Sequence, residues 1–142
     1  MSEILLVEDS SDDIELTLRA FRRFDGELEV CVVKDGEEAL EYLFCEGQYA
    51  GRDPSLRPLL VLLDLNLPKL SGIEVLERLR RHESTRLLPV VVLTTSSEPA
   101  DLERCYEQGA NSYVRKPVDY KDFEEMVKQL GGYWLGLNLR PD

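Results

Sequence analysis

The 142-residue sequence has few groups for thiol or imidazole chemistry, because it contains three cysteines and one histidine. Cys31, Cys45 and Cys105 match no zinc motif, and their odd number does not suit a disulfide framework, so we expect small core residues in a reducing compartment. His82 has no acidic or serine partner at a suggestive spacing, so we expect it at the surface near a helix end. These shortages argue against a zinc site and a disulfide scaffold.

Long apolar runs and an excess of basic residues are also missing. No stretch is long enough to cross a membrane, and the acidic start MSEILLVEDSSDD lacks the basic segment of a signal peptide, which favours a cytoplasmic protein. The formal net charge is −11, and a surface this negative repels the phosphates of nucleic acids. We therefore expect no membrane and no nucleic-acid partner, and the charge suits a basic protein partner or a cation site.

The residues that are present fit one globular domain, with 43% hydrophobic and 32% charged residues. Short apolar runs alternate five times with helical patterns, which predicts an α/β fold, a doubly wound parallel sheet of five strands flanked by five helices. The expected strands are 4–7, 28–33, 59–63, 90–93 and 113–114. The expected helix starts are Ser10 or Ser11, Asp35, Ser71, Ser97 to Pro99, and Asp119. The segment 46–58 is expected to be a surface loop.

Carboxylates follow the first and third apolar runs, where buried strands are expected to end. Glu8 and Asp9 follow the first run, and Asp64 follows the third. In open α/β sheets, ligands bind beyond the carboxyl ends of the strands, so we expect these three side chains to converge if the two strands are neighbours. Converging carboxylates repel one another unless a cation lies between them, and Mg²⁺ prefers oxygen ligands. The pattern predicts a magnesium site.

Hydroxyl groups and an ammonium group follow two further strands. The fourth run ends in Thr94, Thr95 and Ser96, and Lys116 follows the fifth. Taken singly, such residues are more often turn or strand residues than functional ones. Taken together at four of five strand ends, carboxylates, hydroxyls and an ammonium suit the binding of a phosphoryl group.

The chain from LLVEDS to KPVDY resembles the receiver domains of two-component response regulators. Five pieces carry the resemblance: Glu8-Asp9, Asp64, Gly72 within LSGIEVL, VVVLTTS, and Tyr113 to Pro117. The resemblance implies the flavodoxin-like receiver fold and a response regulator that accepts a phosphoryl group from a sensor histidine kinase. Such a domain is a phosphoacceptor that catalyses only its own phosphorylation and dephosphorylation.

The resemblance also implies roles for single residues. Asp64 would be the phosphoacceptor. Mg²⁺ would be bound directly by Asp9 and Asp64, by Glu8 through water, and by the backbone carbonyl of Asn66.

Further roles concern the phosphoryl group and the switch. Thr94 would donate a hydrogen bond to one phosphoryl oxygen and Lys116 would pair with another, with a cis bond between Lys116 and Pro117. Tyr113 would move inward as Thr94 moves toward the phosphoryl group; alternatively it is an ordinary strand aromatic with a hydrated hydroxyl. The residues expected to tune the lifetime of the phosphoryl group are Asn66, Thr95 and Ser96.

The end of the chain is expected to divide from the receiver domain at residue 130, leaving 131–142 as a tail that could extend the last helix. The long loop, DLNLPK and the YWLG end are similar to stand-alone receivers paired with bacterial phytochromes. That similarity implies a bacteriophytochrome kinase as partner and a homodimer through the fifth-helix region. The Tyr133–Leu135 cluster could form this interface or cover apolar surface of its own molecule.

Three alternatives stay open at this stage. A magnesium-dependent phosphohydrolase could also use a strand-end aspartate, but Asn66 stands where such enzymes have an acidic proton donor. A degenerate receiver that serves only as an interaction module would not need the complete set of site residues. A phosphorelay intermediate, which passes the group to a histidine phosphotransfer protein, would need the same site.

Overall fold

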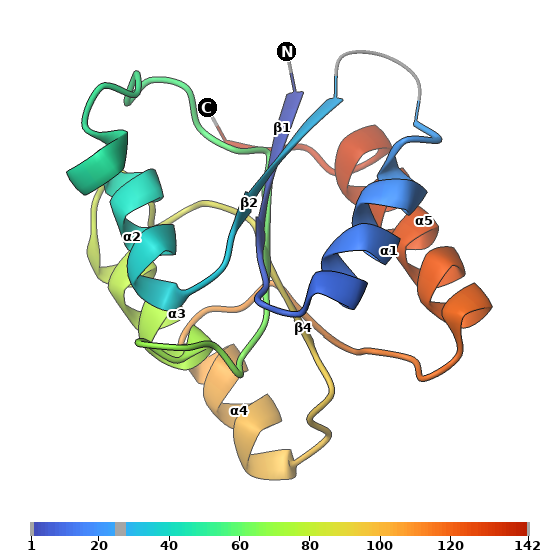
Figure 1. Ribbon diagram of the computed structural model, residues 1–142. Coiled ribbons are helices and arrows are strands. Elements are labelled where there is room, and N and C mark those ends of the chain that lie inside the picture. The colour runs from blue at the N-terminus through green and yellow to red at the C-terminus, as the bar shows by residue number, and fades with distance from the viewer. Residues whose placement is uncertain (1, 25–27, 142) are drawn as a thin grey trace.

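The computed structural model describes residues 2–24 and 28–141 and contains one five-stranded parallel sheet (Figure 1). The strands are β1 (Ser2–Val7), β2 (Leu28–Val33), β3 (Leu60–Leu63), β4 (Val90–Thr94) and β5 (Ser112–Arg115). The helices are α1 (Ser11–Phe21), α2 (Gly36–Phe44), α3 (Gly72–Arg81), α4 (Pro99–Glu107) and α5 (Tyr120–Gly136). Their strand order, β2-β1-β3-β4-β5, confirms the predicted doubly wound α/β fold.

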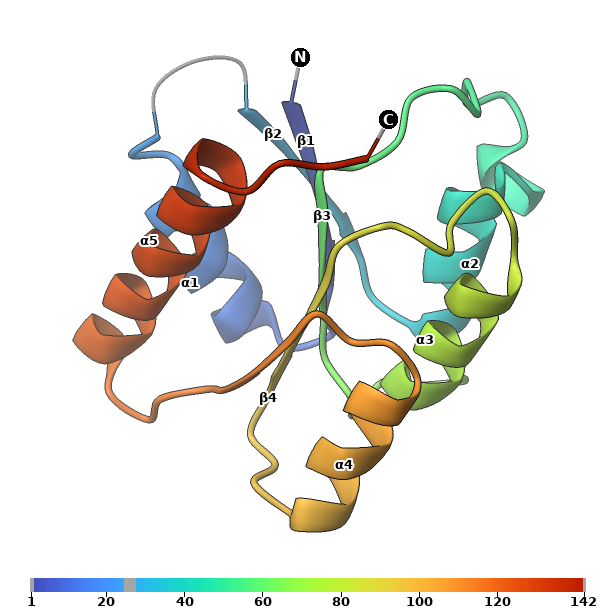
Figure 2. The same cartoon turned by 180° about the vertical axis from the view of Figure 1, so that it is seen from behind.

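Helices cover both faces of this sheet, as Figures 1 and 2 show. Helices α1 and α5 lie on one face, and α2, α3 and α4 lie on the other. The central strand β3 is buried along its whole length, with Leu60 and Leu62 in the core on the α1 and α5 side and Val61 and Leu63 in the opposite core. Burial on both faces explains why β3 reads as an uninterrupted apolar run in the sequence.

The helix starts follow the capping residues predicted from the sequence. Ser10, Asp35 and Ser71 each accept a hydrogen bond from a backbone N–H of the first helical turn, and Asp119 does so at α5. Helix α4 is the exception, because Glu98 makes no side-chain cap and Pro99 begins the helix instead. Strand β1 starts two residues earlier than predicted because it pairs with β2 from Ser2 onward.

The connection 46–58 contains a short 3₁₀ helix, Gly47–Tyr49, and is fastened to α2 by Arg52. The Arg52 guanidinium donates to the carbonyl of Tyr42 at 2.8 Å and to that of Leu56 at 2.5 Å. It also lies 4.0 Å from the centroid of the Tyr42 ring. The loop therefore has a defined conformation despite its length.

The C-terminal segment, expected to be a tail from residue 131, begins as a continuation of the last helix. Helix α5 runs to Gly136, so Tyr133 and Trp134 are helical, with ring centroids 5.1 Å apart. No helix within residues 2–24 and 28–141 is long and apolar enough to span a membrane.

The cysteines and the histidine depart in part from their expected surroundings. Cys105 is buried, but Cys31 and Cys45 are only half-buried, because Cys31 lies on the edge strand β2 and Cys45 follows the end of α2. The exposed ring of His82 does have a serine partner, since the Oγ of Ser84 lies 2.7 Å from its Nδ1. The turn after α3 brings these two residues together, so the expectation of an unpartnered histidine was wrong.

Candidate functional site

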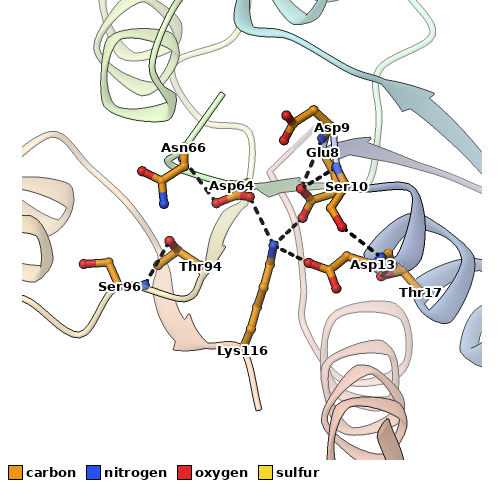
Figure 3. Close-up of polar contacts among 10 residues, drawn as sticks. All are labelled: Glu8, Asp9, Ser10, Asp13, Thr17, Asp64, Asn66, Thr94, Ser96 and Lys116. Carbon is orange, nitrogen blue, oxygen red and sulfur yellow. Dashed lines mark hydrogen bonds and ion pairs between the residues drawn. The ribbon is translucent and has the colours of Figure 1, made fainter. Parts of the chain in front are cut away.

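The three carboxylates predicted to converge do meet beyond the ends of β1 and β3. The two strands are neighbours, and Val7 pairs with Leu63, so the residues after them start from the same edge of the sheet. One carboxylate oxygen from each of Glu8, Asp9 and Asp64 lies within 4.8 Å of the others (Figure 3). Glu8 and Asp64 are buried, whereas Asp9 is exposed, so the cluster opens to solvent on the Asp9 side.

The turn that carries Asp64 is held by the start of α3. The N–H of Gly72 donates to the carbonyl of Leu65 at 2.9 Å. A Cβ atom on Gly72 would lie 2.2 Å from the carbonyl oxygen of Asp64. Only glycine permits this approach, which explains its place in LSGIEVL.

Lys116 reaches the cluster from the end of β5. Its backbone N–H donates to the carbonyl of Thr94 at 2.7 Å. Its ammonium contacts three carboxylates: it forms a short ion pair with Glu8, and it lies 2.8 Å from Asp13 Oδ2 and 3.1 Å from Asp64 Oδ2. The side chains of Lys116 and Asp64 are only 5% and 8% exposed, so solvent screens their ion pair weakly.

Burial and charge shift the pKa values of two groups in this cluster. Burial, together with the nearby charge of Asp64, raises the pKa of Glu8 to about 7, although Lys116 opposes the shift. Burial alone would lower the pKa of Lys116, but its hydrogen bonds to Asp13 and Glu8 and the charge of Asp64 outweigh burial and raise it. Lys116 is therefore charged at neutral pH, and the carboxylates around it still outnumber the positive charge.

This donor set fits a hard divalent cation. All three potential ligand groups are carboxylates, which are the ligands that Mg²⁺ prefers, and the exposed Asp9 leaves room for the waters that Mg²⁺ retains. A dication would also offset the repulsion among the buried acids.

The three hydroxyl residues at the end of β4, Thr94, Thr95 and Ser96, have different surroundings. Thr94 is fully buried beside Asp64, and its Oγ1 accepts a hydrogen bond from the N–H of Ser96 at 3.3 Å. The hydroxyl of Ser96 donates instead to Asp101 Oδ2 on α4, at 2.6 Å. Thr95 is exposed. The structure thus brings the Thr94 hydroxyl to the carboxylates and directs that of Ser96 toward α4.

Comparison with known proteins now identifies the family. The model of the response regulator receiver domain matches residues 4–128, which is most of the chain. The chain belongs to this family. It is a receiver of two-component signalling, and it carries its carboxylate cluster at the strand ends described above.

Two curated relatives resemble this receiver over most of their lengths. The probable methanogenesis regulatory protein FilR2 of Methanothrix harundinacea is 46% identical, and the match covers 97% of this chain and 86% of the relative. Response regulator Rcp1 of Synechocystis sp. is 39% identical, with 93% of this chain and 88% of the relative covered.

Solved structures of phytochrome-associated response regulators have the same fold. The phosphorylated cyanobacterial phytochrome response regulator RcpA superposes with a TM-score of 0.94 at 38% identity and covers 99% of both chains. The Mn²⁺-bound form of Rcp1 also gives a TM-score of 0.94, at 37% identity and with both chains fully covered. This receiver is therefore similar to the phytochrome-associated response regulators.

Tyr113 of the receiver lies where the resemblance placed a switch residue. Its side chain is half-buried and packs against the core on the α2 to α4 side. Its hydroxyl donates to the carbonyl of Ser96 at 3.0 Å rather than only to solvent. The hydroxyl thus has a partner within the protein, and the switch role of Tyr113 stays a prediction.

Asn66 has an exposed side chain and contacts the site through its backbone. Its N–H donates to Asp64 Oδ1 at 3.2 Å. Together with the bond from Lys116 to Oδ2, this contact fixes the orientation of the Asp64 carboxylate (Figure 3).

The expectation of a cis bond between Lys116 and Pro117 was wrong, because every described peptide bond is trans. The trans form is the ordinary state before proline, favoured by about 0.5–1 kcal/mol. It is compatible here with both the backbone bond of Lys116 to Thr94 and the reach of its ammonium to the acids.

Asp13 is the site residue that the sequence interpretation missed. Its side chain binds Lys116, although it was interpreted only as an acidic residue in a helical turn. The available signal was its position three residues after the cap Ser10, on a helix that begins at the same strand end as Glu8. A first-turn acid on such a helix lies next to the crevice.

Proposed function

We propose that this receiver accepts a phosphoryl group on Asp64 from the phosphohistidine of a sensor histidine kinase. The observation that supports the proposal is the setting of the Asp64 carboxylate. It is almost fully buried, it lies 3.1 Å from the Lys116 ammonium, and it lies within 4.8 Å of carboxylate oxygens of Glu8 and Asp9. A phosphoryl group bound there would meet fixed positive charge at the place where negative charge develops.

The transfer is a displacement at phosphorus. An Asp64 oxygen forms the new P–O bond while the P–N bond to the histidine breaks, and its electron pair returns to the imidazole ring, which takes up a proton. Lys116 offsets the charge on the equatorial oxygens, and the Thr94 hydroxyl donates a hydrogen bond to one of them. Mg²⁺ held by Glu8, Asp9, Asp64 and the carbonyl of Asn66 would supply further charge neutralisation.

The test measures the incorporation of phosphate into the receiver from acetyl phosphate, or from an autophosphorylated histidine kinase, in the presence of Mg²⁺. Asp64→Asn should abolish incorporation while circular dichroism shows an intact fold, because an amide cannot form the acyl phosphate. Asp53→Asn is a matched control, because Asp53 lies in the exposed loop 46–58. Incorporation that persists in the Asp64 variant would move the acceptor to another residue.

The switch that follows phosphorylation would use Thr94 and Tyr113. Ser96 contacts both residues, since its N–H donates to Thr94 Oγ1 and its carbonyl accepts from Tyr113. A Thr94 hydroxyl turned toward a phosphoryl oxygen would move away from Ser96, which would loosen the loop that holds Tyr113. Asn66, Thr95 and Ser96, which follow Asp64 or Thr94 in the sequence, would tune how fast water removes the group.

The hydrolase alternative needs an acid that protonates a leaving group. The corresponding residue is Asn66, whose amide cannot serve as this acid. Sustained turnover of phosphate esters would favour a hydrolase, whereas a single stoichiometric incorporation supports the receiver. Transfer from phosphorylated Asp64 to a histidine phosphotransfer protein would instead identify a phosphorelay intermediate.

The partners proposed for this receiver follow from its relatives and its surface. A bacteriophytochrome kinase is the proposed phosphoryl donor, because RcpA, which this chain resembles, is a phytochrome response regulator. Since the kinase reaction consumes ATP, we place it in the cytoplasm. A second copy could bind the open groove of about 440 Å³ between β5 and α5, whose apolar lining includes Val114, Met126, Leu130, Tyr133 and Trp134. Sedimentation of Trp134→Ala against wild type tests the homodimer, and two unchanged monomers would refute it.

A further inference from the structure

Asp13 makes a contact with Lys116 for which the proposed phosphotransfer has no use. The distance from Lys116 Nζ to Asp13 Oδ2 is 2.8 Å, shorter than the 3.1 Å to Asp64 Oδ2. Asp13 belongs to α1, and it is not one of the three clustered carboxylates. The ammonium is thus bound on one side by an acid that would contact neither the metal nor the phosphoryl group.

The position of Asp13 is fixed by its own backbone. Its N–H donates to Ser10 Oγ at 3.3 Å, and its carbonyl accepts from Thr17 Oγ1 at 2.7 Å. In the view of Figure 3, Asp13 and Thr94 lie on opposite sides of the Lys116 ammonium. The ammonium therefore contacts Asp13 on the α1 side, away from Thr94, in addition to its contacts with Glu8 and Asp64.

The number of N–H donors on the Lys116 ammonium limits how many oxygen atoms it can bind at one time. A lysine ammonium has three N–H donors. Three carboxylates, those of Glu8, Asp13 and Asp64, already accept from it. A phosphoryl oxygen on Asp64 can take over the donor that Asp64 Oδ2 now accepts, but a second N–H donor becomes free only if Glu8 or Asp13 gives one up.

Asp13 is the partner that can be released at the lowest cost. Its side chain is 25% exposed, whereas those of Glu8 and Asp64 are 3% and 8% exposed. Water can therefore solvate the Asp13 carboxylate after the ion pair opens, whereas the buried Glu8 would keep only the backbone N–H groups of Asp9 and Ser10 and would lose its cationic partner.

We propose that Asp13 is a positioning residue that holds the Lys116 ammonium on the α1 side of the site until a phosphoryl group on Asp64 draws it away. The inference rests on the proposed function of Asp64. It makes Asp13 a competitor of the phosphoryl group for the same donor. The resting receiver would consequently bind the phosphoryl group more weakly than the other site residues alone allow.

Beryllium fluoride, which mimics a phosphoryl group on a carboxylate, provides a test without turnover. Its affinity in saturating Mg²⁺ can be measured by ¹⁹F NMR. Asp13→Asn should tighten binding about fivefold, as expected for the loss of a partly exposed competing ion pair. Asp12→Asn removes the same charge from the same helical turn at an exposed position and should leave the affinity unchanged.

A double-mutant cycle separates competition for Lys116 from simple charge repulsion. In a Lys116→Met background, Asp13→Asn should no longer alter the affinity, because the shared donor is gone. A gain that persists in this background, or an equal gain from Asp12→Asn, would overturn the proposal. A loss of affinity in Asp13→Asn would also overturn it, because Asp13 would then assist Lys116.

Two further measurements keep the result decisive. Circular dichroism establishes that the variants fold, and Asp13→Ala provides a second substitution that lacks any acceptor. If wild type does not bind beryllium fluoride, or if Asp64→Asn still binds it, the proposed function fails. If wild type binds beryllium fluoride and Asp13→Asn binds it with the same affinity, the proposed function stands and only the proposed role of Asp13 fails.

Discussion

The hydroxyl of Tyr113 donates a 3.0 Å hydrogen bond to the carbonyl of Ser96, and so joins β5 to the loop that follows β4. The same loop residue donates its N–H to Thr94 Oγ1 at 3.3 Å. One residue thus connects the buried hydroxyl beside Asp64 with the aromatic side chain on β5.

Replacing Tyr113 by phenylalanine should therefore destabilise the resting receiver while it preserves the packing of the ring. We expect the free energy of unfolding in urea to fall by about 1 kcal/mol, the usual net value of one hydrogen bond. Tyr120→Phe is the matched control, because the Tyr120 side chain is largely exposed at the start of α5. Equal stability of wild type and Tyr113→Phe would mean that the hydrogen bond contributes nothing to the resting state.

Magnesium should stabilise the protein by binding the carboxylate cluster. At a free concentration of 100 times the dissociation constant, one bound ion adds about 2.7 kcal/mol to the free energy of unfolding. Asp9→Asn should remove most of this gain, because it deletes the exposed acid of the cluster. Thermal unfolding with Mg²⁺ and with EDTA measures the effect, and Asp12→Asn controls for nonspecific charge. A stabilisation that survives in Asp9→Asn would place the ion elsewhere.

Arg80 and Asn111 should be important for stability although neither lies at the site. Arg80 Nη2 donates to Asn111 Oδ1 at 3.1 Å, and the same oxygen accepts from the N–H of Val90 at 2.8 Å. Asn111→Ala would leave the Val90 N–H at the start of β4 without this acceptor, so we expect a loss of about 2 kcal/mol in urea unfolding. Arg78→Ala, at an exposed position of the same helix as Arg80, should change stability by less than about 0.5 kcal/mol.

The parts of the site that lie directly after strands could be predicted from the sequence. Glu8, Asp9 and Asp64 follow apolar runs, and the topology of a parallel sheet then brings them together whatever the details of the loops. Lys116 and Thr94 follow from the same rule. Their convergence also depends on the strand order, which the sequence left as a condition and which the structure shows to be β2-β1-β3-β4-β5.

The contacts that the sequence did not reveal depend on how helices and loops lie on the sheet. The ion pair of Asp13 with Lys116 requires the position of α1, and the bond of Tyr113 to Ser96 requires the conformation of the loop after β4. The Ser84 partner of His82 likewise comes from a turn that no periodic pattern describes. Such contacts arise from packing between elements rather than from local preference.

The buried thiol of Cys105 provides a prediction for the pH dependence of stability. Burial raises the pKa of the Cys105 thiol from its ordinary value of 9.0 to about 11. Below pH 9 the thiol is neutral in both states, so it adds no pH dependence. Between pH 9 and 11 the unfolded chain loses its thiol proton while the folded protein retains it, so unfolding becomes more favourable as the pH rises. Cys105→Ala should reduce this decline relative to wild type.

The measurement is the free energy of unfolding in urea at pH 8, 9, 10 and 11 for wild type and Cys105→Ala, with Cys45→Ala as a control at a half-buried position. The variant should be less stable than wild type at pH 8, because truncation of a buried side chain leaves a cavity. The difference should then narrow as the pH rises, since only wild type loses stability through this thiol. Thiol labelling of native protein at pH 8 should also reach Cys45 before Cys105. Parallel pH profiles for wild type and Cys105→Ala would show that the Cys105 thiol ionises equally easily in the folded and unfolded protein.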